Sequence, residues 1–213
     1  MEKKDSDRLK IKIAEGVEGP LDQEIEILDP KTYPHYVSIG KFNIDLPVPL
    51  YNQCDTSWRN VIMQTCGYTI CSAGCALTST AMVFKYFGAI NKNPQQLNSC
   101  LGSKACPIYW KIASDNCNEC WENLHGAYFV DKYGYSLSLL ASALNNGRPP
   151  ILELKKNTLT HWVVARKVDG DGTSLSHYTI NDPNGGVVRP LTDYTNNGWS
   201  GNSIVIYKLI WCA

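Results

Sequence analysis

The chain contains nine cysteines, and this number limits the fold more than any other feature of the sequence. An ordinary cytosolic protein rarely holds so many, because disulfides form and persist in oxidising compartments. An odd number cannot all pair within one chain, so at least one thiol must be free or bonded to another molecule. The cysteines therefore predict a crosslinked domain that keeps one thiol for another purpose.

Cysteine and charge are both distributed unevenly along the chain. Residues 1–46 carry 7 basic and 10 acidic side chains, a net charge of −3, and no cysteine, whereas residues 47–213 hold all nine cysteines and a net charge of +3. The first segment alternates apolar and polar residues, which is typical of short half-buried strands. We therefore predict an acidic, strand-rich N-terminal extension at 1–46, which packs on the main domain or on a partner chain, and a main domain at 47–213.

Composition narrows the classes of function. A hydrophobic content of 44% with 19% charged residues excludes a disordered chain, and a formal net charge of zero argues against a nucleic-acid partner. No apolar run is long enough for a transmembrane segment, and the charged N-terminus lacks the apolar core of a signal peptide. The cysteine content nevertheless predicts an extracellular or cell-surface location.

The main domain shows helical patterns first and strand patterns after them. Residues 74–87 and 136–145 have apolar residues at helical spacing, and Asn93 followed by Pro94 is typical of a helix start. Four strand-like runs follow, with a hairpin turn expected at 169–172, and the runs are residues 151–154, 162–168, 178–180 and 204–210. A helical front half and an antiparallel back half predict an α+β domain.

Cys75 is a candidate nucleophile because it lies at the expected start of the helix at 74–87. The unpaired N–H groups and the positive end of the helix dipole stabilise an anion there, so we expect a lowered thiol pKa. Gly74 lets the backbone turn tightly and leaves the sulfur open to a substrate. The alternative is that Cys75 is one more disulfide partner.

A thiolate nucleophile needs a base, and His161 is the candidate among the four histidines. It opens a strand pattern just after a polar loop, so the strand would hold the ring while the loop leaves it accessible. Asp182 ends the next strand, and antiparallel neighbours bring the end of one strand beside the start of the other. We expect Asp182 to accept the ring N–H of His161, as in a catalytic triad. Taken singly, the two residues are also compatible with a half-buried histidine and a turn aspartate.

Five ordered segments resemble the papain-like cysteine peptidases of the bacteriocin-leader-processing type, above all their stand-alone relatives without a transporter. The resemblance implies a papain-like fold, with the nucleophile helix packed on an antiparallel sheet. It also implies Cys75 as nucleophile, His161 as general acid and base, and Asp182 as the residue that orients His161, with no cofactor and no metal. The segments are VPLYNQ (48–53), SAGCALTSTAMVFKYFG (72–88), LLASALNNGRPPILEL (139–154), THWVVARKVDGDG (160–172) and YTINDPNGG (178–186).

The resemblance further implies an oxyanion hole made by a glutamine amide and the backbone N–H of Cys75. Family members usually place this glutamine a few residues before the cysteine. Here Gln53 lies 22 residues before Cys75 and Gln64 lies 11 residues before it. The VPLYNQ context favours Gln53, and Gln64 is the alternative.

Without Cys75, an even set of eight cysteines remains, enough for up to four disulfides. The alternative for part of this set is a structural zinc site, because Cys117 and Cys120 form a C-x₂-C pair that Cys100 and Cys106 would complete. One metal would leave the other four unexplained, so we favour disulfides. Those other four are Cys54, Cys66, Cys71 and Cys212.

The residues and the resemblance together predict a thiol-dependent hydrolase that cleaves peptide bonds through an acyl-enzyme intermediate. Its partner would be a peptide or protein substrate. A second version keeps the triad and acts on the peptide cross-bridges of peptidoglycan, as a lysin does. A third hypothesis is a papain-like structural or binding module in which Cys75 is unreactive or disulfide-bonded.

Overall fold

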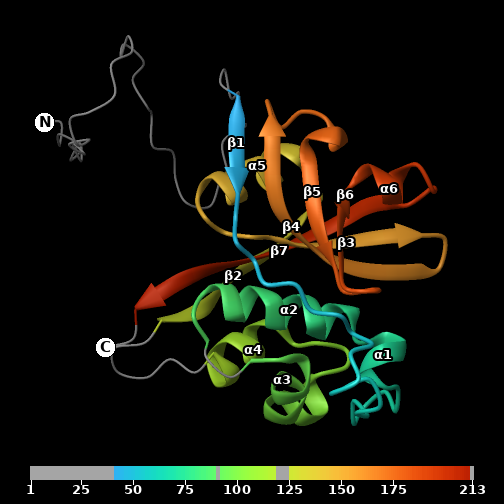
Figure 1. The fold of residues 1–213 in the computed structure, drawn as a ribbon. Helices are drawn as coiled ribbons and strands as arrows, with labels where there is room; N and C mark the ends of the chain where they lie inside the picture. The colour runs from blue at the N-terminus through green and yellow to red at the C-terminus, as the bar shows by residue number, and fades with distance from the viewer. Residues whose placement is uncertain (1–40, 90–91, 119–124, 212–213) are drawn as a thin grey trace, which may run out of the picture. The chain divides into compact units, whose positions relative to one another are not determined.

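The computed structural model describes residues 41–89, 92–118 and 125–211 (Figure 1). The strands expected before residue 41 lie outside this range, as do Cys120 and Cys212. The division of the chain at residue 46 therefore stays a prediction.

The helices gather mostly in the front half of the described chain, as the sequence pattern predicts. Figure 1 shows α1 to α4 together on one side of the strands, and α5 contacts β1 and β4. Asn93 caps α3 with a reciprocal capping box, and Ser136 caps α5. The helices are α1 (Ile70–Ala73), α2 (Cys75–Tyr86), α3 (Pro94–Leu101), α4 (Trp110–Cys117), α5 (Leu137–Asn145) and α6 (Thr192–Thr195), with single 3₁₀ turns η1 (Gly102–Lys104) and η2 (Leu175–His177).

The described strands form one seven-stranded sheet in which every pair is antiparallel. The order is β2, β7, β3, β4, β5, β6, and β1 pairs separately with the last residues of β4. The strands are β1 (Phe42–Asp45), β2 (His125–Gly134), β3 (Ile151–Lys156), β4 (Leu159–Gly170), β5 (Tyr178–Asp182), β6 (Val187–Pro190) and β7 (Ser200–Trp211). This mixture of helices and an antiparallel sheet is compatible with the α+β class that the sequence predicts.

The structure also contains elements that the sequence pattern misses, namely α1, α4, β2, β6 and α6. β2 interrupts the helical half, and its pairing with β7 shifts register between Phe129 and Asp131, so its side chains do not keep a clean period of two. The link from β4 to β5 is longer than the predicted hairpin turn. There the Asp171 carboxylate accepts the N–H of Thr173, and η2 follows before β5 begins.

The core lies where α2 packs on the sheet. Residues 77–84 of α2 are all buried, and the Phe84 ring packs edge-on against Tyr207 of β7 at 5.2 Å. Each fully buried large apolar side chain stabilises the fold by about 1.5 to 3 kcal/mol. A helix buried on every side in this way cannot shift without opening the core, so its first residue, Cys75, has a rigid support.

Three disulfides join six of the described cysteines, Cys54–Cys71, Cys66–Cys106 and Cys100–Cys117, and Cys75 is free. The prediction of disulfides over zinc is confirmed for these six. The zinc alternative is wrong, because three of its four ligands are already bonded to other cysteines. Among the described residues, no cluster of ligand side chains suited to a metal ion occurs.

None of the helices in the described ranges is long and apolar enough to cross a membrane. The three disulfides are compatible with an extracellular location.

Candidate active site

Cys75 is the first residue of α2, and Gly74 precedes it as the N-cap without any side-chain cap. The first turn of α2, where the half-buried thiol lies, therefore has no side-chain acceptor at its N-cap. Gly74 is needed here for space, because a Cβ at this position would collide with the carbonyl oxygen of Ile70 in α1. The close approach of α1 is thus what requires a glycine before the cysteine.

His161 and Asp182 come from β4 and β5, which pair antiparallel. Their side chains meet, with His161 Nε2 2.8 Å from Asp182 Oδ1. The Asp182 side chain has no exposed surface, and that of His161 is 12% exposed. The expectation that the end of one strand would lie beside the start of the next matches this geometry.

The His161 ring also lies close enough to Cys75 for the thiol to affect the pKa of the imidazole. Burial lowers the pKa of the imidazole, but the hydrogen bonds to Asp182 and Cys75 and the charges of both partners outweigh burial and raise that pKa to about 9. The ring is therefore positively charged at neutral pH. An imidazolium beside a thiol is the arrangement that favours a thiolate.

The Asp182 carboxylate is surrounded by donors. Burial alone would raise its pKa, but hydrogen bonds from His161, from Tyr194 and from the backbone N–H of Asn184 hold the pKa below its ordinary value. Asn184 donates to Oδ1 at 2.8 Å, and the Tyr194 hydroxyl donates to Oδ2 at 2.7 Å. Arg189 adds a positive charge, with its Nε 3.3 Å from Oδ2. Asp182 is therefore a buried carboxylate whose negative charge is stabilised by three hydrogen-bond donors and by the nearby guanidinium of Arg189.

Sequence reasoning did not find Tyr194 or Arg189. Tyr194 lies in α6, a helix of four residues, and Arg189 lies in the edge strand β6. Neither element has the apolar periodicity that reveals a buried segment, so the sequence carried no signal that either side chain would face Asp182.

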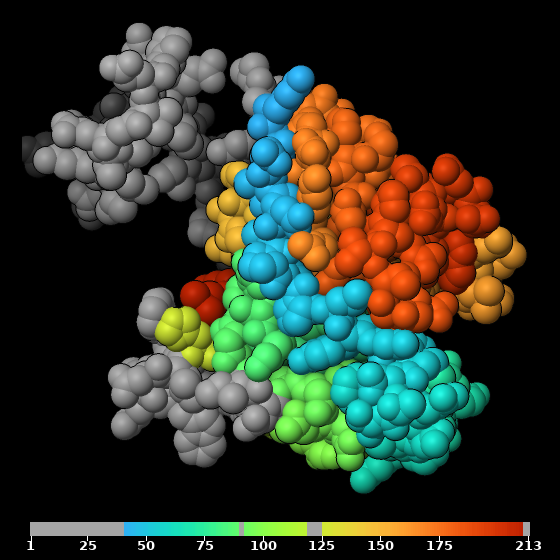
Figure 2. All heavy atoms as spheres, viewed as in Figure 1, coloured from blue at the N-terminus to red at the C-terminus, as the bar shows by residue number. Residues whose placement is uncertain are grey.

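The chain leading to Gln53 runs over the surface from β1 toward the helices, as the blue segment in Figures 1 and 2 shows. The Asn181 amide holds it by donating to the carbonyls of Val48 and Pro49 at 3.0 and 3.2 Å. The backbone N–H of Gln53 then donates to the carbonyl of Pro183 at 2.9 Å. This segment is thereby attached to the turn that follows Asp182.

The Gln53 side chain is buried and reaches the residues before Cys75. Its Nε2 donates to the carbonyl of Cys71 at 2.6 Å, and the neighbouring Cys54 is disulfide-bonded to the same Cys71. Gln64 is exposed and its side chain lies near Gly102. Of the two glutamines considered for the oxyanion hole, Gln53 is the one bonded to the segment that leads into α2.

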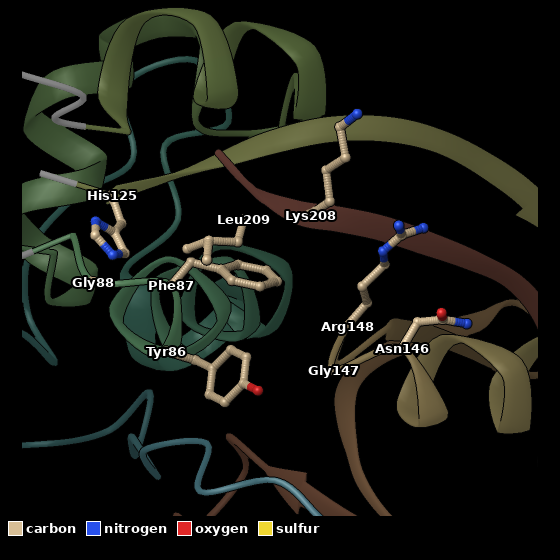
Figure 3. Close-up of a pocket in the computed structure, with 9 residues that line it drawn as sticks. All are labelled: Tyr86, Phe87, Gly88, His125, Asn146, Gly147, Arg148, Lys208 and Leu209. Carbon is tan, nitrogen blue, oxygen red and sulfur yellow. The ribbon is translucent and has the colours of Figure 1, made fainter. Parts of the chain in front are cut away.

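Two cavities in the described part of the chain are lined by other residues. One, of about 590 Å³, lies at the far end of α2 and includes Tyr86, Phe87, Arg148 and Lys208 (Figure 3). A helix of 12 residues is about 18 Å long, so this cavity is remote from Cys75. The other, of about 660 Å³, lies between α5 and the loop after β4. The contacts among Cys75, His161 and Asp182, rather than a deep cavity, identify the candidate site.

One comparison with known proteins places the chain in a family. The model of the Peptidase_C39 like family matches residues 45–201, a range that includes Gln53, Cys75, His161 and Asp182. The chain belongs to this family, which confirms the resemblance to papain-like cysteine peptidases predicted from the sequence. No curated protein and no solved structure matches the chain.

Proposed function

We propose that the protein is a thiol-dependent peptidase with a papain-like fold, in which Cys75 is the nucleophile, His161 the general acid and base, and Asp182 the residue that orients His161. The observation that carries the proposal is the His161–Asp182 hydrogen bond beside Cys75, which is a free thiol at the start of a buried helix and affects the pKa of His161. Membership of a peptidase family supports the same assignment.

The first half of the reaction forms an acyl-enzyme. The Cys75 thiolate attacks the carbonyl carbon of a peptide bond, and the new oxyanion accepts hydrogen bonds from the Cys75 backbone N–H and from Gln53 Nε2. One N–H of this amide bonds the Cys71 carbonyl, which leaves the second N–H for the oxyanion. The C–N bond breaks as the His161 imidazolium gives its proton to the departing amine.

The second half of the reaction restores the enzyme. Neutral His161 takes a proton from water, and the resulting hydroxide attacks the thioester carbonyl. The C–S bond breaks, the carboxylic acid product leaves, and the site returns to thiolate and imidazolium. Throughout this cycle Asp182 keeps the imidazole in one orientation and stabilises its positive charge.

We place this activity on peptides or proteins outside the cell or at its surface, because three disulfides crosslink the domain. One version of the structural or binding-module hypothesis has Cys75 in a disulfide. That version is wrong, because this thiol is free. Digestion of a peptide library in parallel with purified cell wall would decide between a peptidase and a peptidoglycan cross-bridge hydrolase.

Alkylation of the unreduced protein tests the nucleophile. We expect iodoacetamide at pH 7 to label Cys75 rapidly, because His161 lies beside it. Labelling should be selective among the described cysteines, because the other six are in disulfides. In His161→Ala the thiol loses its cationic partner, and the labelling rate should fall roughly tenfold or more, because the thiolate is the form that reacts with iodoacetamide. Peptide mapping by mass spectrometry gives the site and the rate. Equal rates in the two proteins would contradict the proposal.

A further inference from the structure

One tyrosine touches both members of the His161–Asp182 pair. The Tyr194 hydroxyl donates to Asp182 Oδ2 at 2.7 Å, and the Tyr194 ring stacks on the His161 ring with centroids 5.4 Å apart and planes inclined by 29°. His161 bonds the other carboxylate oxygen, Oδ1. A carboxylate held at both oxygens cannot rotate about its Cβ–Cγ bond, so the oxygen that faces His161 stays in place.

The Tyr194 ring is itself held by aromatic and cationic neighbours. Trp199 packs edge-on against Tyr194 at 5.5 Å and against His161 at 6.4 Å. The Arg189 guanidinium lies 5.8 Å from the centre of the Tyr194 ring. Three rings and one cation thus pack together beside a carboxylate that has no exposed surface, and water is kept from the His161–Asp182 bond.

Arg189 does not replace the tyrosine as a donor. Its Nε lies 3.3 Å from Asp182 Oδ2 but makes no hydrogen bond within the described residues, so it supplies charge only. The Tyr194 hydroxyl is the hydrogen-bond donor to this oxygen. Burial and the bond to Asp182 raise the pKa of Tyr194, so the hydroxyl keeps its proton wherever the enzyme is folded.

Backbone hydrogen bonds hold the turn that contains α6. Leu191, which is fully buried, donates its N–H to the carbonyl of Tyr178 at 3.0 Å, and Trp199 donates its N–H to the carbonyl of Tyr194 at 3.2 Å. The turn between β6 and β7 is therefore tied to β5 through Leu191 and closed on itself by the bond from Trp199 to Tyr194, and it brings Tyr194 to the pair.

We propose that Tyr194 is a positioning residue of the active site, which holds the Asp182 carboxylate and the His161 ring in the orientation that stabilises the Cys75 thiolate. The inference rests on the proposed function and goes beyond it, because it adds to Cys75, His161, Asp182 and Gln53 a side chain that acts through the pair without touching substrate.

The variant Tyr194→Phe removes the hydroxyl and keeps the stacked ring. The probe is iodoacetamide, and the readout is the rate of Cys75 alkylation between pH 4 and 9. Without the hydroxyl, the carboxylate loses one bond that favours its charged form and one that fixes its rotation, so the thiolate is less well stabilised. We expect the midpoint of the alkylation profile to move to higher pH by roughly half a unit or more, which lowers the rate at the acid end about threefold.

Tyr178→Phe is the matched control. Tyr178 is also a buried tyrosine of this region, and its hydroxyl donates to the carbonyls of Leu137 and Gly172 rather than to Asp182. This variant should lose stability in thermal unfolding and keep the wild-type alkylation midpoint. If Tyr194→Phe shifts the midpoint no more than Tyr178→Phe, then Tyr194 is merely structural and the inference fails.

The two proposals fail in different ways. If wild-type Cys75 is not alkylated faster than in His161→Ala, the proposed function is wrong. If that difference is present and the Tyr194→Phe midpoint is unchanged, only the role of Tyr194 is wrong. Tyr194→Leu removes the ring as well as the hydroxyl, and it should shift the midpoint at least as far as Tyr194→Phe; a smaller shift would contradict the inference.

Discussion

Asp182 is a charged side chain without exposed surface, and its neighbours explain how the fold tolerates it. Burying an unpaired carboxylate costs several kcal/mol, whereas one that accepts several hydrogen bonds beside a cation stays ionised. Here His161, Asn184 and Tyr194 donate to the carboxylate and Arg189 adds charge. Removing one donor leaves a buried charge that is poorly satisfied, so residues around Asp182 affect both stability and chemistry.

The raised pKa of His161 makes stability depend on pH. A group whose pKa rises on folding stabilises the native state fully below its unfolded pKa, and that contribution is lost as the pH rises through the folded pKa. For His161 this window runs from about 6.5 to about 9. We expect the contribution of His161 to the free energy of unfolding to fall across this window by on the order of 1 to 3 kcal/mol.

Urea unfolding at a series of pH values measures this loss in Cys75→Ser, where the proton exchanged by the thiol no longer enters the balance, and in Cys75→Ser/His161→Gln. The double variant lacks the titrating ring, so its stability should change much less between pH 6.5 and 9. Parallel curves for the two proteins would contradict a raised pKa of His161.

The sequence could reveal a site residue only where a local pattern, such as a helix start or a strand end, marks the element that carries it. Cys75 stands at a helix start and His161 at a strand start, and Asp182 ends the next strand, so each was predictable from the element that carries it. Tyr194 was not predictable, because it reaches Asp182 only through the path of the chain between β6 and β7. The bond between Gln53 and the Cys71 carbonyl joins residues 18 apart, and no local pattern indicates it.

At the scale of elements, the Cys54–Cys71 disulfide connects the segment of Gln53 to α1, directly before the nucleophile helix. We therefore expect it to hold the proposed oxyanion donor as well as to stabilise the fold. In Cys54→Ser/Cys71→Ser, peptide hydrolysis should fall, and Gln53→Ala in that background should cost much less than the roughly 100-fold loss expected in wild type.

Cys100→Ser/Cys117→Ser is the matched control for this prediction. The two disulfides span the same sequence separation of 17 residues, so their removal should destabilise the fold by a similar amount, about 3 kcal/mol. The Cys100–Cys117 bond joins α3 to α4 and makes no contact with Gln53 among the interactions described. Peptide hydrolysis, measured under conditions in which both double variants are folded, should fall only in Cys54→Ser/Cys71→Ser. Equal losses would show that the Cys54–Cys71 bond acts through stability alone.

At the scale of the whole molecule, β1 joins part of the predicted extension to the sheet of the main domain. Residues Phe42–Asp45 pair with the end of β4, and the Arg166 guanidinium donates to Asp45 Oδ1 at 2.6 and 2.9 Å. The charge and cysteine patterns placed the boundary at residue 46, whereas this pairing continues the sheet back to residue 42.

Two truncations test where the folding unit begins. Removal of residues 1–40 keeps β1, and we expect the remaining chain to fold and to retain rapid Cys75 alkylation. Removal of residues 1–46 deletes β1 with its ladder and ion pair, so its midpoint of thermal unfolding should be several degrees lower. Equal unfolding midpoints for the two truncations would favour the boundary at 46.

The sequence by itself determined the α+β class, the family, the helix that begins at Cys75 and the surplus of cysteines beyond it, because these depend on local periodicity, on capping residues and on ordered motifs. Only the tertiary structure decided which cysteines pair, which glutamine lies beside the segment before Cys75 and which side chains surround Asp182. Each of these depends on residues far apart in the chain, and their separations in space follow from how α2, the sheet and the β6–β7 turn pack together. The contact of Tyr194 with His161 and Asp182 is therefore a property of the folded chain and of no segment within it.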